Sequence, residues 1–243
     1  MMTDAEKIQW EEARSAVYGF FSQAFIRGPS QQFLKALISD EGTANLREIF
    51  PDAAYRQELA QVQLDAREGR LTLEGAVLDF EALFRVPGSR YLSPYESVYR
   101  SKTASGWGCL CGPETAAVER LYLKEGLGPS DEFAELPDHV GVELEFMAIL
   151  CRKAVEAMQA GNDAAAQEYR HQQYCFFVEH LGTWVRLLAE RLASQAQTSL
   201  YRFLGNFLNL FLELEGNLHF REVGVPDAVT SRNRCQPEHG VGR

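Results

Sequence analysis

Apolar residues recur every three or four positions along almost the whole chain, with polar residues between them. Over residues 4–26 the apolar positions are Ile8, Ala13, Val17, Phe20, Phe21, Ala24 and Phe25. This stripe is typical of an amphipathic helix. The same pattern predicts helices over residues 4–26, 31–38, 44–50, 51–68, 71–84, 114–125, 137–159, 163–194 and 194–214. No alternating strand pattern competes, so the sequence predicts an all-α fold.

The longest interruption of the helical pattern covers residues 85–112, which are rich in glycine and proline. Loops of this length are uncommon in compact domains and are often functional. The aromatic residues of this loop, Tyr91, Tyr95, Tyr99 and Trp107, predict that it is ordered on the body of the protein. It divides one helical domain, residues 1–215, into an N-terminal half of about residues 1–105 and a C-terminal half of about 110–215. Residues 216–243 are expected to form a flexible tail.

The charge of the chain limits its partners. The 243 residues carry a net charge of −10, from 34 Asp and Glu against 24 Lys and Arg. Because phosphate binding needs a basic surface, the charge argues against a nucleic-acid partner. An acidic surface favours a basic partner, such as a peptide rich in Arg or Lys, although it can equally serve only to keep a protein soluble.

The hydrophobic segments predict a cytoplasmic location. The N-terminus lacks a basic stretch followed by an apolar core, so it does not resemble a signal peptide. The longest apolar stretch, residues 201–214, is too short and too polar to span a bilayer. We therefore expect no stable membrane insertion.

Patterns that would indicate an enzyme are few. The phosphate-binding and dinucleotide-binding glycine loops and the nucleophile elbow are absent. A di-iron centre needs two Glu-x-x-His pairs and two further acids, but the chain has one such pair, Glu168 and His171. A helical metal or redox enzyme that uses this pair with His139 and Glu143 is the weaker alternative. We expect no cofactor.

The cysteines give no firm metal site. Cys109 and Cys111 form a C-x-C pair, whereas zinc and iron–sulfur sites usually use C-x-x-C with further ligands. The total of five cysteines is odd, which suggests reduced thiols.

The segment LPDHVGVELEF, from residue 136, reads as the start of a helix. Pro137 suits the first helical position, and Asp138 is expected to cap free backbone N–H groups. The positive end of the helix dipole disfavours a charged imidazole, so His139 is expected to be neutral near neutral pH. From these residues alone, a plain helix start explains the pattern better than a catalytic base, because no motif supplies a nucleophile.

Three stretches follow one another in a characteristic order: FEALFRVPGSRYLSPYESVYR at 80–100, LPDHVGVELEFMAIL at 136–150 and FFVEHLGTW at 176–184. Together they resemble the TorD/DmsD family of redox-enzyme maturation chaperones, which includes the NarJ-like proteins. Each stretch is weak alone, but their order, spacing and helical background agree. The stretch 106–111 and the tail after residue 216 lie outside this pattern.

The resemblance implies a cytoplasmic chaperone with a TorD-like helical bundle, not an enzyme. Such a protein binds the apo catalytic subunit of a molybdopterin-dependent oxidoreductase. It often recognises the subunit's twin-arginine signal peptide and delays export until the cofactor is inserted. A leader-independent, NarJ-like assembly factor is the alternative, and the protein is expected to be a monomer or a domain-swapped dimer. The resemblance assigns peptide binding to Leu83, Phe84, Pro87, Pro94, Tyr95, Glu96, Pro137, Asp138, His139 and Glu143.

A leader with two arginines and an apolar core needs a groove with an apolar floor and an acidic rim. The sequence suggests a floor of Phe84, Tyr91, Tyr95 and Tyr99 and a rim of Glu81, Glu96, Asp138, Glu143 and Glu145. The open alternative is that the P-Y-E-S-V-Y run only pins the loop to the helices. Glu179, His180 and Trp184 are expected to make core and helix-to-helix contacts.

Overall fold

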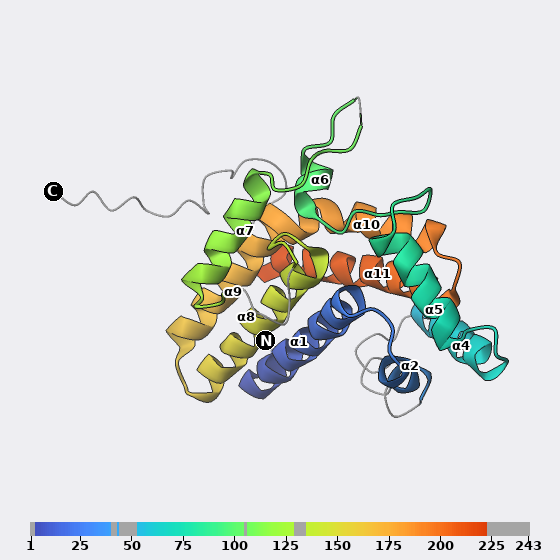
Figure 1. The fold of residues 1–243 in the computed structure, drawn as a ribbon. Coiled ribbons are helices and arrows are strands. Elements are labelled where there is room, and N and C mark those ends of the chain that lie inside the picture. Colours follow the sequence, from blue (N-terminus) through green and yellow to red (C-terminus); the bar gives the residue numbers. More distant parts are fainter. Residues whose placement is uncertain (1–2, 40–42, 44–52, 105, 129–134, 223–243) are drawn as a thin grey trace.

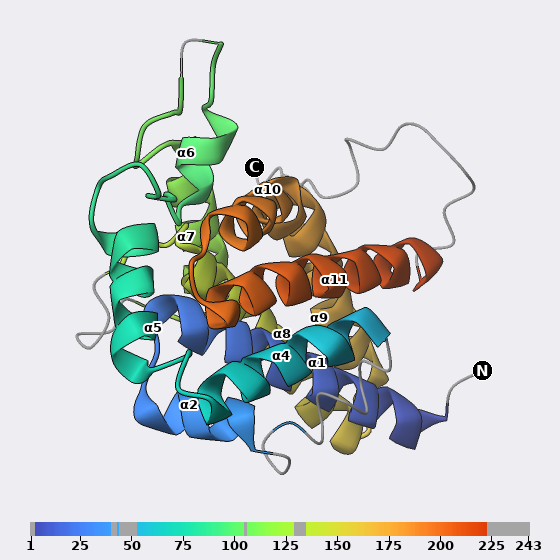
Figure 2. The same ribbon diagram turned by 90° about the vertical axis from the view of Figure 1, so that its right-hand side faces the viewer.

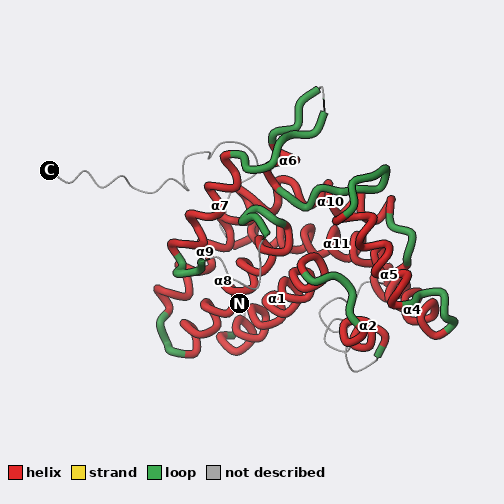
Figure 3. Tube along the Cα trace, viewed as in Figure 1, coloured by secondary structure: helices red, strands yellow, loops and turns green. Residues whose placement is uncertain are grey.

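The computed structural model describes residues 3–39, 43, 53–104, 106–128 and 135–222, and this part of the chain is built of helices and loops without a strand (Figure 3). The all-α prediction is confirmed. The α-helices are α1 (Asp4–Ile26), α2 (Gln31–Ile38), α4 (Ala53–Arg67), α5 (Leu73–Phe80), α6 (Glu96–Arg100), α7 (Pro113–Lys124), α8 (Val140–Gln159), α9 (Asp163–Phe176), α10 (Gly182–Gln195) and α11 (Ser199–Glu222). Two π-helical turns, η1 (Glu81–Arg85) and η2 (Phe177–Leu181), continue α5 and α9.

Helix α8 lies between α1 and α9, and α11 packs along α10 and also reaches α4 and α5 (Figures 1 and 2). Apolar side chains from these helices form one continuous core. Its largest fully buried members include Tyr18, Phe21, Phe25, Leu144, Trp184, Tyr201, Phe203 and Phe207. Burial of so many aromatic rings is the main favourable contribution to folding.

Two features fix how the helices cross. Gly205 of α11 has no side chain where it meets α10, and a Cβ there would lie 2.6 Å from the backbone nitrogen of Ala193. The buried guanidinium of Arg14 on α1 donates to both carboxylate oxygens of Glu215 on α11, at 2.8 and 2.6 Å. It also donates to Glu11, at 2.9 Å. The Arg14–Glu215 ion pair therefore links α1 to α11. Loss of either partner would destabilise the fold, because it would leave the other charge buried and unpaired.

The helix bounds agree with the sequence prediction for 4–26 and 31–38, and the predicted helix over 44–50 lies outside the described residues. The last helix extends beyond the predicted end at Leu214, to Glu222. Residues 223–243 of the expected tail also lie outside the described part.

Within the loop over residues 85–112, the part around Tyr95 and Tyr99 packs on the body, as its aromatic residues predicted, and it contains the unpredicted helix α6. The described residues between 101 and 111 are mostly exposed and project from the body (Figure 1). The ring of Tyr99 lies 5.1 Å from that of Trp184 on α10. Trp107 contacts the cations of Lys102 and Arg191, at 4.3 and 4.4 Å from its ring centre. These contacts explain how a segment with little regular structure keeps one conformation.

Candidate peptide-binding site

The loop and the start of α8 meet in a paired segment that we call the motif joint, formed by residues 94–97 and 138–140. The backbone of Tyr95 pairs with that of His139 in an isolated antiparallel bridge. The amide of Glu96 donates to the carbonyl of Asp138 at 3.0 Å, and the amide of Val140 donates to the carbonyl of Pro94 at 2.8 Å. Two of the three sequence stretches that predicted the family are therefore hydrogen-bonded to each other.

Asp138 and His139 have different roles in this joint from those predicted. Asp138 does not cap α8; its fully buried carboxylate accepts from the amide of Ser97, at 2.9 Å. His139 is the N-cap, and its Nδ1 accepts from the amide of Gly141 at 3.1 Å. Pro137 precedes the helix instead of starting it, and its carbonyl accepts from the hydroxyl of Tyr122 at 3.0 Å. A helix does begin in this segment, but it starts at Val140 and not at Pro137, and the prediction of which side chain caps it was wrong.

The imidazole of His139 is held neutral by its surroundings. Its pKa is lowered to about 4, mainly by burial and also by nearby Arg85, whereas Glu135 and Asp138 act in the opposite direction. The predicted neutral state therefore has burial as its main cause. The hydrogen bond from Gly141 agrees with this state, because an accepting Nδ1 carries no proton.

Behind the joint, acidic side chains are buried and cannot form a rim. Glu96 and Glu143 are both 0% exposed. Glu96 contacts Nδ1 of His180 at 2.9 Å and accepts from Arg100 at 2.9 Å. Glu143 accepts from the indole nitrogen of Trp184 at 3.1 Å, and burial, with nearby Glu96, raises the pKa of Glu143 well above its usual value. Of the suggested rim, Glu96, Asp138 and Glu143 are thus interior residues, whereas Glu81 and Glu145 are exposed.

The Leu-Phe pair is also interior. Leu83 is fully buried, and Phe84 packs between the rings of Phe25 and Tyr201, with ring centres 5.5 and 6.1 Å away. Phe84 and Tyr99 are therefore core residues and not the floor of an open groove. Among the predicted peptide-binding residues, Pro87 is exposed and Tyr95 and Pro137 are half-buried, whereas the others are buried.

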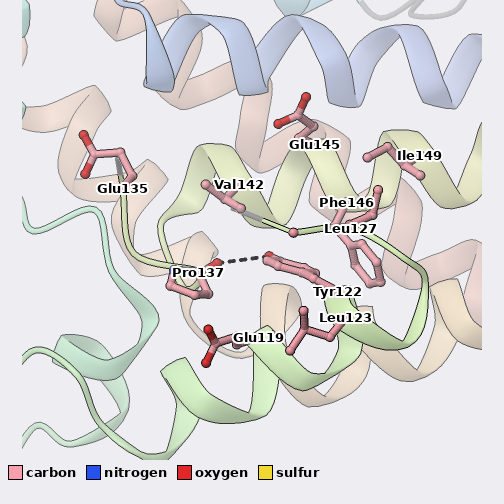
Figure 4. Close-up of a pocket in the computed structure, with 11 residues that line it drawn as sticks. Glu119, Tyr122, Leu123, Leu127, Glu135, Pro137, Val142, Glu145, Phe146 and Ile149 are labelled. Atoms are coloured by element: carbon pink, nitrogen blue, oxygen red, sulfur yellow. Dashed lines mark hydrogen bonds between the residues drawn. The ribbon is translucent and has the colours of Figure 1, made fainter. Parts of the chain in front are cut away.

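An open groove lies beside the joint, between α7 and α8 (Figure 4). We call it the α7–α8 groove; its volume is about 340 Å³. Apolar side chains line most of it: Tyr122, Leu123, Leu127, Pro137, Val142, Phe146 and Ile149. Three carboxylates, those of Glu119, Glu135 and Glu145, surround these side chains in Figure 4. An apolar floor with an acidic rim is what a cationic, partly apolar peptide requires.

One of these carboxylates, Glu135, is held by two side chains from the loop. Its Oε2 accepts from the hydroxyl of Tyr95 at 2.6 Å, and its Oε1 accepts from Nη1 of Arg85 at 2.9 Å. Although burial acts against ionisation, these partners lower the pKa of Glu135. The groove therefore keeps a charged, oriented carboxylate next to Pro137.

The structure does not support the metal-site alternative. In the described ranges no three His, Cys, Asp or Glu side chains are grouped as metal ligands would be. Glu168 and His171 are exposed on α9, whereas His139 and Glu143 are buried at the start of α8. Cys109 and Cys111 are exposed thiols on the loop. Among the described helices, none has the length and apolar character needed to cross a membrane.

Comparison with known proteins decides the family. Residues 51–190, more than half of the chain, match the family described as "nitrate reductase delta subunit". The chain belongs to this family. The match confirms the predicted resemblance to TorD- and NarJ-type maturation chaperones, and no solved structure matches the chain.

Family relatives are described as chaperones. The chaperone protein TorD of Vibrio cholerae is 25% identical over 83% of this chain and 90% of its own length. The TorD protein of Shewanella loihica is 24% identical over 84% of this chain and 92% of its own length. A chlorate reductase assembly chaperone of Ideonella dechloratans is 30% identical over 61% of this chain and 72% of its own length. The protein is therefore a redox-enzyme maturation chaperone and not a catalytic enzyme.

Sequence reasoning missed most of the groove. Leu123, Phe146 and Ile149 follow ordinary helical spacing, so each reads as a core position. Leu123 is 57% exposed, which only the packing of α7 against α8 reveals. Glu145 was expected at an acidic rim and does line the groove.

Proposed function

We propose that the protein acts in the cytoplasm, where it binds the apo catalytic subunit of a molybdopterin-dependent oxidoreductase together with its twin-arginine leader. Binding keeps the subunit available for cofactor insertion and delays export. The α7–α8 groove is the surface that receives the leader, with its edge at Glu135 and Pro137. The groove's combination of apolar floor and carboxylate rim is the observation that carries this proposal.

The chemistry of the groove suits such a leader. An apolar segment buries its side chains against Leu123, Phe146 and Ile149, and burial supplies the free energy of binding. The arginines pair with the rim carboxylates in water-exposed positions, so they add orientation and association rate more than affinity. The overall charge of −10 attracts a cationic peptide from a distance.

A chaperone of this kind must also release its client. Micromolar binding, or about −8 kcal/mol, allows release without an energy source. Because rim ion pairs are screened, the affinity should fall as salt rises, while the apolar contribution remains.

Calorimetry with a synthetic twin-arginine peptide tests the proposal. The Leu123→Asp variant places a charge in the groove at an exposed position, so it should weaken binding at least about tenfold without unfolding the protein. Leu187→Asp is the matched control, because Leu187 is 39% exposed on α10 and does not line the groove. If both variants and the wild type bound the peptide with equal affinity, the groove would not be the surface that receives the leader.

A second candidate is favoured by the family description itself, which names a reductase subunit and not a leader. In this case the protein binds the mature part of the apo subunit and ignores the leader. Pull-down of a leaderless apo subunit against the leader peptide alone separates the two. Capture of only the leaderless subunit would support the second candidate.

A further inference from the structure

Glu135, which lines the edge of the α7–α8 groove, is already paired with an arginine of the protein's own, Arg85. Nη1 of Arg85 lies 2.9 Å from Oε1 of Glu135. The Arg85 side chain is 43% exposed, whereas that of Glu135 is 16% exposed. The carboxylate is thus the fixed member of the pair, and the guanidinium is the member that solvent can reach.

Glu135 is built to receive a guanidinium. The hydroxyl of Tyr95 fixes its second oxygen at 2.6 Å. Glu135 lies at the edge of the groove, and its carboxylate points outward from the apolar side chains (Figure 4). Arg85 is held less firmly. Besides Glu135 it has a 3.3 Å contact with the carbonyl of Ile26 and lies 5.6 Å from the ring centre of Phe80.

We propose that an arginine of the client segment takes the place of Arg85 on Glu135 when the apolar part of that segment enters the groove. The inference rests on the proposed function and names a specificity-determining residue for it, Glu135, with Arg85 as an internal competitor. Neither residue was among the predicted peptide-binding positions.

The exchange explains how arginine is selected without very tight binding. One guanidinium–carboxylate pair replaces another, so the net electrostatic change is small, and the apolar contacts in the groove drive binding. A segment without a cation leaves Arg85 in place and gains only the apolar contacts. Removal of the Arg85 guanidinium should therefore strengthen the binding of peptides that contain arginine and leave the binding of peptides without a cation unchanged.

A double-mutant cycle tests the exchange, with a synthetic peptide of two arginines followed by a leucine–alanine segment as the probe. For this peptide, Arg85→Gln should strengthen binding about two- to fivefold, the range of a partly exposed ion pair. Glu135→Gln alone should change the affinity less than about twofold, because it removes both the old pair and the new one. In the Arg85→Gln, Glu135→Gln double variant the gain should disappear.

Two controls separate this mechanism from general charge effects. A peptide with glutamines in place of both arginines should bind the wild type and Arg85→Gln equally, which also shows that the variant is folded. Arg120→Gln makes the same charge change at an exposed position on α7 that does not line the groove, and it should not reproduce the gain.

Weaker or unchanged arginine-peptide binding by Arg85→Gln, or a gain that persists in the double variant, would overturn the exchange and leave the proposed function standing. Failure of the wild type to bind either the peptide or the apo subunit would overturn both.

Discussion

The buried imidazole of His139 makes a specific contribution to how stability depends on pH. Its pKa in the folded protein is about 4, compared with an ordinary value of 6.5. Between these values the unfolded chain binds a proton that the folded chain does not. The contribution of the neutral imidazole to stability is therefore fully present above the ordinary pKa of 6.5, and it is lost as the pH falls toward the folded pKa of about 4. Protonation of the folded form would also break the hydrogen bond from Gly141 to Nδ1.

The size of the effect follows from proton linkage. Within the window each pH unit changes the free energy of unfolding by about 1.4 kcal/mol. At about pH 5, which is roughly 1.5 units below the ordinary value, His139 should lower the stability by about 2 kcal/mol relative to about pH 7.5. This is a large part of the stability of a typical domain.

The His139→Asn variant isolates this contribution. Asparagine is a good N-cap and can accept from the same helix end, but it does not titrate. Urea unfolding of both proteins across this pH range gives the difference in their free energies of unfolding. The wild type should lose about 2 kcal/mol relative to the variant between about pH 7.5 and pH 5. The contributions of other groups largely cancel in this difference.

A difference that stays constant with pH would refute the reasoning, because it would mean that folded His139 takes up its proton as readily as the unfolded chain. An NMR titration of the His139 ring in the folded protein provides an independent check. A midpoint near the ordinary value would show that burial does not keep this imidazole neutral.

Three further predictions concern the interior. Glu143→Gln should stabilise the protein progressively as the pH rises above the ordinary carboxyl value, by up to about 1.4 kcal/mol per unit in urea unfolding, because the raised pKa of Glu143 makes its contribution present at low pH and lost at high pH. A difference in stability between the variant and the wild type that does not change with pH would contradict this prediction. Arg14→Met should cost about 3–5 kcal/mol by leaving Glu11 and Glu215 buried without their cation; a cost below about 1 kcal/mol would show that the network is dispensable. Gly205→Ala should cost about 1–3 kcal/mol in thermal unfolding, because the added Cβ meets the backbone of α10. An unchanged melting temperature would mean that α10 and α11 can move apart to accommodate the methyl group without cost.

The helices were predictable because their amphipathic spacing is a local property of the sequence. Residues 4–26 carry both an apolar stripe and a Gly28–Pro29 stop, so both ends were correct. The π-turn η2 was not predictable. Residues 163–194 fit one helical stripe, and the extra residue in the turn depends on packing that the sequence pattern does not contain.

The site was harder to predict because acidic residues in helices usually face water. Glu96 and Glu143 were therefore placed at a rim, although both are buried against His180 and Trp184. His180 lies 84 positions after Glu96, and Trp184 lies 41 positions after Glu143. Local spacing in the sequence cannot reveal such distant pairs.

The position of the family motif has a consequence for client choice. Tyr95, Asp138 and His139 join the loop to α8, and most of the motif side chains are buried in doing so. A substitution in the joint is therefore expected to disturb the fold as well as any peptide contact. Loss of binding in an Asp138→Ala variant would not by itself show that Asp138 touches the client. The groove side chains that a client can reach, such as Leu123 and Glu145, lie outside the joint and can change without breaking it. We infer that the joint preserves the shape of the chaperone while the neighbouring surface of α7 and α8 determines which client it accepts.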